Sequence, residues 1–254
     1  MIKLSSVIIT FNEERNIGRC IESLAGIADE IVVVDSGSTD DTHTICKSFG
    51  VKFIINPFEG YIQQKNFATN HCSFDHILSL DADEALSPEL KNSIELLKNN
   101  WEKDGYSFKR LTNYCGQWIY HCGWYPDRKL RLYRKGKGMW SGSNPHDQFV
   151  LNSPADSGSI KGDLLHFSYY SVQDHVKQVN KFTEIGAQSA FKEGKRSSLI
   201  HILIKPAIRF LRDYFFHLGI LDGYSGFIIC KISAHASFIK YVKLYELQKT
   251  KNKS

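Results

Sequence analysis

The segment ILSLDADEAL, residues 77–86, joins a short apolar run to three carboxylates within four positions. The apolar residues before Asp81 are typical of a strand that is buried on both faces of a sheet. Asp81, Asp83 and Glu84 follow at the point where that strand ends. Because a hydrophobic core gives such charges no compensation, we expect them to line a crevice that binds a ligand.

Strands that end in polar turns also occur upstream. Ile17, Ile21 and Leu24 recur at helical spacing after the first, and a Gly/Ser/Thr/Asp turn suited to helix capping follows the second. The expected strands are residues 4–10, 30–35, 51–56 and 76–80, and the expected helices are residues 11–27, 40–50 and 61–72. Strands that alternate with helices in this way predict an α/β fold with a parallel, doubly wound sheet and right-handed crossovers.

Regular elements continue after the carboxylates. Helical spacing returns at residues 87–101, where Ser87 can cap the helix and Pro88 can occupy its first turn. Aromatic and charged residues then alternate through residues 105–123 and 128–136, as they do in strands. We expect these elements to complete the same domain.

The C-terminal region differs from the rest in pattern and in charge. Residues 172–248 are mostly helical in pattern, with an interruption at 219–226, so we expect an α/β domain over residues 1–170 and a helical region over 171–254. From Lys192 onward there are 12 Lys and Arg against 4 Asp and Glu, in a chain of net charge +5. This balance favours a surface for anionic lipid or another polyanion, and an ordinary solvated basic face is the alternative.

The composition is typical of a folded globular protein. A chain of 254 residues with 42% hydrophobic residues can bury a proper core, and six prolines without a low-complexity tract argue against disorder. The first residues resemble neither a signal peptide nor a membrane span, so we expect a cytosolic protein. The six cysteines are scattered, which indicates reduced thiols rather than a disulfide framework.

Asp81 and Asp83 are separated by one residue at a strand end, a spacing that suits a hard divalent cation such as Mg²⁺ or Mn²⁺. The cation would neutralise a diphosphate, whereas without it the two carboxylates would repel each other and one would tend to bind a proton. A solvated acidic turn is the alternative. The polar groups that end the upstream strands favour the metal site.

Three segments, in this order, resemble the nucleotide-sugar domain of inverting glycosyltransferases of family 2: VIITFNEERNI (7–17), IVVVDSGSTDDT (31–42) and LSLDADE (78–84). The resemblance implies the GT-A fold, in which helices flank a mostly parallel, Rossmann-like sheet. Four later segments resemble the lipopolysaccharide core branch of the family: residues 127–149, 164–169, 210–227 and 238–246. The resemblance covers nearly the whole chain and implies an enzyme that transfers a sugar.

The resemblance also implies residues that contact the nucleotide. Thr10, Asn12 and Glu13 match a first-strand motif that binds it, and Asp35 and Ser36 match the turn near uracil and ribose. Many relatives have a second acidic residue where this chain has Ser36. As alternatives, Thr10 and Asn12 could cap the first helix, and Asp35 and Ser36 could have a similar capping role.

Diphosphate and metal contacts are implied in the same way. Lys65 and Asn66 match a basic-Asn pair that approaches the diphosphate, and the alternative for Lys65 is a solvated lysine on a helix. Asp81 and Asp83 match the metal-binding D-x-D motif, with Asp83 as the expected direct ligand and Asp81 assisting. His166 matches a late histidine that some GT-A enzymes bring to the metal or the diphosphate, and a buried, hydrogen-bonded core histidine is the alternative.

Inverting transfer needs a base that takes the proton of the acceptor hydroxyl. Asp147 matches the acidic member of a His-acidic pair in related sequences, where Glu is more frequent, and an ordinary loop aspartate is the alternative. For the adjacent His146 we favour a structural role. We expect Arg131 or Arg134 to meet an acceptor phosphate or the donor diphosphate.

Two C-terminal segments, 206–219 and 236–249, place apolar residues among Arg and Lys at helical intervals. This pattern is typical of helices that lie on a bilayer, and helices packed on the domain or on another subunit are the alternative. The segment 219–230 is too short to span a membrane and is broken by Asp222. We therefore expect a peripheral protein on the inner face of the cell membrane.

Taken together, the sequence predicts a metal-dependent inverting glycosyltransferase that uses a nucleotide-sugar donor, with a UDP-sugar favoured. The expected acceptor is the lipopolysaccharide core, and no nucleic-acid partner is expected. The alternatives are transfer to polyprenyl phosphate or to a capsule or glycan intermediate, a nucleotidyltransferase, and a catalytically inactive scaffold of the same fold.

Overall fold

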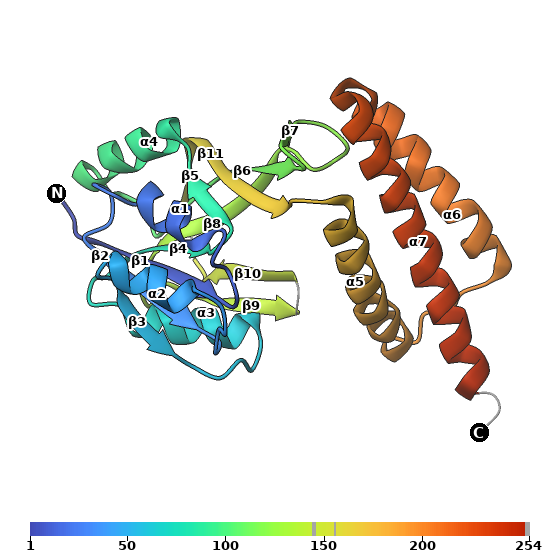
Figure 1. Ribbon diagram of the computed structural model, residues 1–254, viewed down its shortest axis with the longest axis horizontal. Coiled ribbons are helices and arrows are strands. Elements are labelled where there is room, and N and C mark those ends of the chain that lie inside the picture. Colours follow the sequence, from blue (N-terminus) through green and yellow to red (C-terminus); the bar gives the residue numbers. More distant parts are fainter. Residues whose placement is uncertain (144–145, 155, 252–254) are drawn as a thin grey trace. The chain divides into compact units, whose positions relative to one another are not determined.

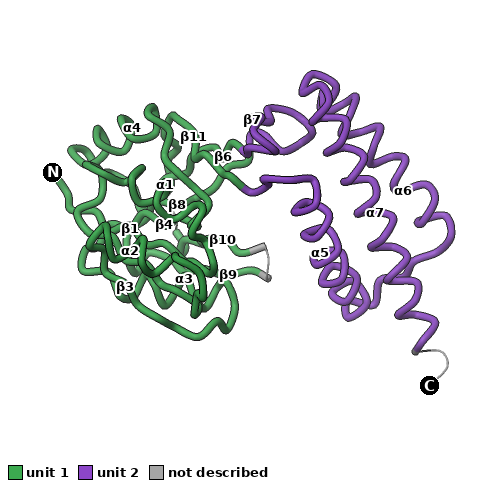
Figure 2. Tube along the Cα trace, viewed as in Figure 1, with its two compact units in different colours: residues 1–111, 127–167 green, residues 112–126, 168–254 purple. Residues whose placement is uncertain are grey.

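The computed structural model describes residues 1–143, 146–154 and 156–251. The chain forms two compact units, which are coloured separately in Figure 2. Unit 1 comprises residues 1–111 and 127–167, and unit 2 comprises residues 112–126 and 168–254. Residues 112–126 thus group with the C-terminal helices, although their alternating pattern had suggested that they belong to the α/β domain.

The first half of unit 1 is a parallel sheet, as predicted (Figure 1). Its strands lie in the order β3-β2-β1-β4, with β1 at Leu4–Thr10, β2 at Glu30–Asp35, β3 at Lys52–Ile55 and β4 at His76–Asp81. The connecting helices are α1 (Ile17–Ser23), α2 (Thr42–Ser48) and α3 (Tyr61–Asn70). The register pairs Thr10 with Asp35 and Ile9 with Asp81, so the polar ends of β1, β2 and β4 meet at one edge of the sheet.

Further strands extend this sheet beyond β4. The order continues β8-β6-β11-β5, with β5 at Glu84–Leu86, β6 at Gly105–Tyr114, β8 at Asp127–Arg134 and β11 at Ser157–Tyr169. β8 is antiparallel to β4 and to β6, and β11 is antiparallel to β5. A separate antiparallel pair is formed by β9 (Gly138–Ser143) and β10 (His146–Leu151). The predicted α/β fold class is confirmed, and the sheet is mixed because its later strands run antiparallel.

Helix α4 (Pro88–Asn99) begins as its sequence predicts. The Ser87 hydroxyl accepts the N–H of Leu90 at 3.2 Å, and Pro88 occupies the first turn. A capping serine satisfies one of the amides at the helix start that have no partner within the helix.

Both faces of the parallel sheet are buried. Val7 and Ile8 are neighbours on β1, yet Val7 packs with Val34 and Tyr133 on one face while Ile8 packs with Leu80 on the other. Successive side chains of a strand point to opposite faces, so a strand covered on both sides needs a continuous apolar run. This requirement explains the runs that identified the strands in the sequence.

Unit 2 consists mainly of helices, as predicted. They are α5 (Val172–Lys192), α6 (Leu199–Leu211), the π-helical turn η1 (Arg212–Phe216), the 3₁₀ turn η2 (Gly219–Asp222) and α7 (Gly223–Lys251). The short strand β7 (Gln117–Ile119) pairs with the end of β6. Tyr114, Ile119 and Cys122 pack with Ile229 and Cys230 in one core, and Ala187 and Ala190 of α5 pack with Leu244 of α7 in another.

Among the described residues, no helix taken singly has both the length and the apolar character to cross a membrane. One pair of helical segments meets these two criteria jointly: Leu199–Phe216 and Gly219–Thr250, which meet at a bend of 73°.

Candidate active site

Thr10, predicted to contact a nucleotide, ends β1 at the polar edge of the sheet. It is 5% exposed, and its hydroxyl has no hydrogen-bond partner among the described residues. Leaving a buried polar group without a partner costs about 1–3 kcal/mol. A ligand that bonds to this hydroxyl would remove that cost.

Asn12 connects the loops that follow β1 and β2. Its φ is 54°, in the left-handed region where asparagine is more frequent than most residues. Its N–H donates to Ser38 Oγ at 2.8 Å, and its Oδ1 accepts the N–H of Thr39 at 2.8 Å. Helix α1 begins only at Ile17 and has no side-chain cap. The alternative in which Thr10 or Asn12 caps this helix is therefore wrong.

Asp35 shapes the turn after β2. It is 2% exposed, and its Oδ2 accepts the N–H groups of Gly37 at 2.8 Å and Ser38 at 2.7 Å. The Ser36 hydroxyl accepts a hydrogen bond from Gln64 at 3.1 Å. Helix α2 has no side-chain cap, so the capping alternative for Asp35 and Ser36 is also wrong. Contact of these two residues with uracil or ribose stays a prediction.

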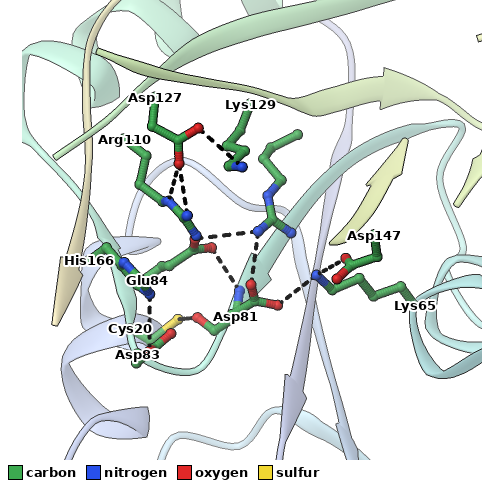
Figure 3. Close-up of polar contacts among 11 residues, drawn as sticks. Cys20, Lys65, Asp81, Asp83, Glu84, Arg110, Asp127, Lys129, Asp147 and His166 are labelled. Carbon is green, nitrogen blue, oxygen red and sulfur yellow. Dashed lines mark hydrogen bonds and ion pairs between the residues drawn. The ribbon is translucent and has the colours of Figure 1, made fainter. Parts of the chain in front are cut away.

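Lys65, on α3, joins two of the predicted site residues (Figure 3). Its Nζ lies 2.9 Å from Asp81 Oδ1 and 2.7 Å from Asp147 Oδ2. The ammonium also lies over the Trp140 ring, 4.4 Å from its centroid. Because Lys65 is only 2% exposed, the alternative of a solvated helix lysine is wrong. The side chain of Lys65 therefore links the end of β4 to strand β10.

Asp81 is balanced by a second cation. Nη2 of Arg131 on β8 lies 2.8 Å from Asp81 Oδ2 and 3.4 Å from Glu84 Oε1. Burial by itself raises the pKa of Asp81, but Arg131 and Lys65 more than offset this and hold it well below its usual range. Asp81 therefore stays ionised without a metal ion, because the protein itself supplies the compensating charge.

Glu84 fixes the turn that follows β4. It is fully buried, and its Oε2 accepts the N–H of Asp81 at 2.9 Å. Its Oε1 lies 3.4 Å from Nη1 of Arg110, whose Nη2 lies 2.8 Å from Asp127 (Figure 3). The sequence showed Glu84 as a third carboxylate but gave it no role, and nothing in the pattern distinguished Arg110. Both act on the site by orienting Asp81.

Asp83 points away from this cluster and toward His166 (Figure 3). His166 Nε2 lies 3.2 Å from Asp83 Oδ2, and the N–H of Phe167 donates to the Asp83 carbonyl oxygen at 2.9 Å. Burial raises the pKa of Asp83, but the neighbouring His166 outweighs it, so the pKa lies below the usual value. Strand β11 thus brings His166 to Asp83, and contact of His166 with a metal ion or a diphosphate stays a prediction.

The donor set suits a divalent cation only in part. Among the residues that the structure describes, no three His, Cys, Asp or Glu side chains are grouped so that they could hold a metal ion. Asp81, Asp83 and His166 thus do not form one three-ligand group, because Asp81 is engaged by Lys65 and Arg131. Asp83 still fits a cation of the Mg²⁺ or Mn²⁺ type, which is usually bound through one or two carboxylates with water and phosphate oxygens in its other positions, and His166 lies beside this carboxylate.

The remaining predicted residues have structural contacts. The side-chain amide of Asn66 makes two hydrogen bonds to the backbone of Trp140, both at 3.0 Å: Nδ2 donates to the carbonyl oxygen, and Oδ1 accepts the N–H. These bonds hold β9 to α3. Arg134 pairs in register with His76, at the end of β4 opposite Asp81, so of the two arginines it is Arg131 that reaches the carboxylates. The side chain of His146 lies outside the described residues.

The pKa of Glu13, in the loop that follows β1, is strongly altered. Burial is the main cause, the hydrogen bond from Asn16 opposes it, and the charges of Asp83, Asp40 and Asp81 add to it, so the pKa of Glu13 rises to about 7. Nδ2 of Asn16 donates to Glu13 Oε2 at 2.7 Å. Glu13 therefore titrates near neutral pH in the folded protein.

This shift predicts a pH-dependent stability. The folded state binds the Glu13 proton more tightly than the unfolded chain, so the stabilisation is present below about pH 4.5 and is lost as pH rises to about 7. Glu13→Gln is expected to reduce the difference in free energy of unfolding between pH 5 and pH 8, measured by urea denaturation. Glu22→Gln, on the exposed side of α1, serves as the control. If Glu13→Gln left the difference in free energy of unfolding between pH 5 and pH 8 unchanged, the raised pKa of Glu13 would be contradicted.

Comparisons with known proteins bear on the family to which the chain belongs. A family model described as Glycosyl transferase family 2 matches residues 5–193. The chain is 36% identical to an uncharacterized glycosyltransferase of Rickettsia typhi over an alignment of 257 positions, which covers 97% of this chain and 88% of that protein. It is 34% identical to the lipopolysaccharide core biosynthesis glycosyltransferase LpsC of Rhizobium meliloti over an alignment of 256 positions, which covers 96% of this chain and 93% of that protein.

A weaker similarity links the chain to a solved structure. Glucosyl-3-phosphoglycerate synthase from Mycobacterium tuberculosis, in complex with Mn²⁺, uridine diphosphate and glucosyl-3-phosphoglycerate, is 23% identical with a TM-score of 0.36. The match covers 44% of each chain.

Proposed function

Because the chain belongs to glycosyltransferase family 2, we propose that it is a metal-dependent, inverting enzyme that transfers a sugar from a nucleotide-sugar donor to a lipopolysaccharide core acceptor. The observation that carries this proposal is the Lys65 ammonium between Asp81 and Asp147. It connects the strand end expected at the donor diphosphate with the carboxylate expected at the acceptor. Such an arrangement suits a single displacement, in which both substrates meet at one carbon atom.

The donor site is proposed at the edge where β1, β2 and β4 end. Ligands of open α/β sheets bind outside the carboxyl ends of the strands. The unpaired Thr10 hydroxyl and the loop joined by Asn12 and Ser38 lie at this edge. A UDP-sugar is the favoured donor, with Asp35 and Ser36 near the nucleoside and Lys65 near the diphosphate.

Asp83 and His166 would hold Mg²⁺ or Mn²⁺ together with donor phosphate oxygens. A bound cation of this kind offsets the charge that develops on a leaving diphosphate. The protein's own part is to orient these two side chains. It does so through the backbone bond between Phe167 and Asp83 and through the pairing of His166 with Glu84 in the β5–β11 register.

Asp147 is proposed as the general base. It would take the proton of the acceptor hydroxyl while that oxygen attacks the anomeric carbon from the side opposite the diphosphate. In the structure its Oδ2 is 2.7 Å from the Lys65 ammonium. The acceptor hydroxyl must therefore approach the carboxylate while it remains beside this cation.

The acceptor and the location follow from the relatives and the charge of unit 2. A relative that is 34% identical acts in lipopolysaccharide core biosynthesis according to its name. The lipopolysaccharide core is anionic, which suits the 12 Lys and Arg against 4 Asp and Glu from Lys192 onward. We place the enzyme at the inner face of the cell membrane, where lipid-linked acceptors are accessible to a cytosolic active site.

A panel of nucleotide sugars tests the proposed function. The full-length protein is incubated with UDP-, GDP-, ADP- and CMP-sugars, with Mn²⁺ or with EDTA, and thermal stabilisation and sugar release are followed. One UDP-sugar is expected to give a Mn²⁺-dependent response in both measurements. Binding without hydrolysis or transfer to any lipopolysaccharide or polyprenyl phosphate acceptor would instead identify an inactive scaffold.

Thr10→Val tests the nucleotide site separately from catalysis. The substitution keeps the shape and removes the unpaired hydroxyl, so the free energy of unfolding is expected to rise by about 1 kcal/mol. The same change removes one bond to the nucleotide, so the Kd for UDP is expected to rise about tenfold. Urea denaturation and titration calorimetry measure the two effects.

Ser79→Ala is the matched control for Thr10→Val. Ser79 is 1% exposed, and its hydroxyl likewise has no hydrogen-bond partner among the described residues, but it lies within β4 rather than at its end. It should gain stability without any change in UDP affinity. An unchanged UDP affinity for Thr10→Val would remove Thr10 from the nucleotide site.

A further inference from the structure

Unit 2 exposes an unusually apolar surface at its bend. We define the elbow as residues 199–227, which comprise α6, η1, η2 and the first turn of α7 (Figure 1). Large apolar side chains are exposed all along it, and the most exposed are Leu199, Ile200, Leu203, Phe216, Leu221 and Tyr224, at 65–82%. Exposed apolar side chains gathered in this way mark an interaction surface rather than ordinary surface composition.

The acidic side chains of the elbow are buried. Asp213 and Asp222 are the acidic residues between 199 and 231, and they are 1% and 5% exposed. Asp213 pairs with Arg209, with Nε of Arg212 at 2.9 Å and with Nδ1 of His217 at 3.1 Å. The negative charge of Asp213 is thus compensated inside the fold.

Asp222 is held by hydrogen bonds from the 112–126 segment of unit 2. Its Oδ2 accepts the N–H of His121 at 2.9 Å, and its Oδ1 lies 2.9 Å from Nδ1 of the same residue. Both acidic side chains are thus buried, while the exposed Lys and Arg residues between positions 199 and 231 are Lys205, Arg209, Arg212 and Lys231. The outer surface of the elbow is therefore apolar and cationic.

Close packing fixes the bend between η1 and α7. Leu218 has a φ of 54°, and a Cβ added to Gly219 would lie 2.8 Å from Cys230 Sγ and 3.0 Å from Cys122 Sγ. A Cβ on Gly226 would lie 1.9 Å from the carbonyl oxygen of Gly219, so the backbones touch. Two glycines permit this contact, and the apolar side chains are therefore presented by a folded element rather than by a loose end.

The later helical segment is accounted for by packing. Leu244 of α7 is buried with Ala187 and Ala190 of α5, and Tyr241 and Leu247 pack against them. For residues 236–249 the structure thus supports the alternative of helices packed on each other within unit 2. The predicted contact with a bilayer therefore stays open only for residues 206–219, which lie in the elbow.

We infer that the elbow inserts into the interfacial region of one leaflet of an anionic phospholipid bilayer. Its apolar side chains would lie among the lipid headgroups. Lys205 of the elbow and Lys231, just beyond it, would bind lipid phosphates, together with the exposed parts of Arg209 and Arg212, whose side chains are 44% and 47% exposed beside Asp213. Within the elbow, Leu199–Phe216 meets the start of the segment Gly219–Thr250 at a bend of 73°, so the elbow presents a corner rather than a straight helix. This inference deepens the proposed lipid-linked acceptor, and its purpose rests on that function.

A vesicle-binding experiment with the full-length protein tests the inference. Leu203→Asn, Phe216→Asn and Leu221→Asn are combined, since all three side chains are 65–82% exposed and their loss should leave the fold intact. The affinity for vesicles of phosphatidylglycerol mixed with phosphatidylcholine is expected to fall about 100-fold. Ile55→Asn combined with Leu96→Asn is the matched control, because these side chains are 68% and 72% exposed on unit 1. The control should bind as the unmodified protein does.

Two further measurements separate the possible outcomes. Binding should weaken on vesicles of phosphatidylcholine alone and at high salt, because the cations of the elbow act on anionic lipid. The inference is overturned if the unmodified protein does not bind vesicles. It is also overturned if the unmodified protein sediments as a dimer and the elbow variant as a monomer, because the elbow would then contact a second copy of the chain rather than lipid. UDP-dependent thermal stabilisation should be the same in both variants, so failure of the elbow and failure of the proposed function are distinguishable.

Discussion

Asp83→Asn is expected to slow sugar transfer about 1,000-fold, because a neutral amide would no longer hold the cation that offsets charge on the leaving diphosphate. An effect of this size corresponds to about 4 kcal/mol of transition-state stabilisation. The fold should be unaffected, since among the described residues the Asp83 side chain pairs with His166 and Asn can retain a bond there. Transfer rates with Mn²⁺ and the unfolding midpoint measure the two effects.

Asp81→Asn is the informative comparison for Asp83→Asn. Asp81 compensates two buried cations, Lys65 and Arg131, whose side chains are 2% and 5% exposed. Removing its charge should destabilise the fold by about 2 kcal/mol or more, because buried charges are left with less compensation. The Asp83 assignment is wrong if Asp83→Asn transfers sugar at the normal rate, whatever Asp81→Asn does.

Asp147→Asn is expected to lower transfer by about 1,000-fold, within the range attributed to general-base catalysis, while UDP-sugar binding stays near its normal strength. Asparagine preserves the shape of the side chain but cannot accept the acceptor's proton. Lys65 keeps Asp81 as a partner at 2.9 Å, so the variant should fold. The measurements are kcat for transfer and the Kd of the donor by calorimetry.

Gln148→Ala is the matched control for Asp147→Asn, since Gln148 is the exposed neighbour on the same strand. Its transfer rate should be unchanged. A normal kcat for Asp147→Asn would move the role of base to another residue. A loss of donor binding equal to the loss of transfer would show that Asp147 acts only by positioning Lys65.

Much of the fold could be predicted because its strands have a strong local signal. A strand buried on both faces, such as residues 30–35, must be apolar at every position, so its sequence identifies it without knowledge of its neighbours. The boundary of α1 was less accurate. Residues 11–16 were assigned to the helix, but Asn12 bonds to Ser38 and Thr39 instead, and these partners lie 26 and 27 positions away.

The site residues were identified more readily than their contacts. Polar groups at strand ends predicted that Thr10, Asp35, Asp81 and Asp83 share an edge, and the parallel register places the first three there together. Glu84 and Arg110 were missed as orienting residues. A buried ion pair depends on which charges the fold brings together, and the spacing of charges along a strand carries no information on the partner.

The sequence by itself determined the alternation of strands and helices, the family and the edge of the sheet where chemistry is expected, because these depend on periodicity and on motifs of contiguous residues. Only the tertiary structure decided that Lys65 contacts both Asp81 and Asp147, the second of them 82 positions away from Lys65. It likewise decided that Arg131 compensates Asp81, and which face of the C-terminal helices is exposed. Helical spacing defines an apolar face but does not say what covers it, and a carboxylate in a motif does not reveal which cation lies beside it. Both are set by the packing of distant segments, which local sequence does not encode.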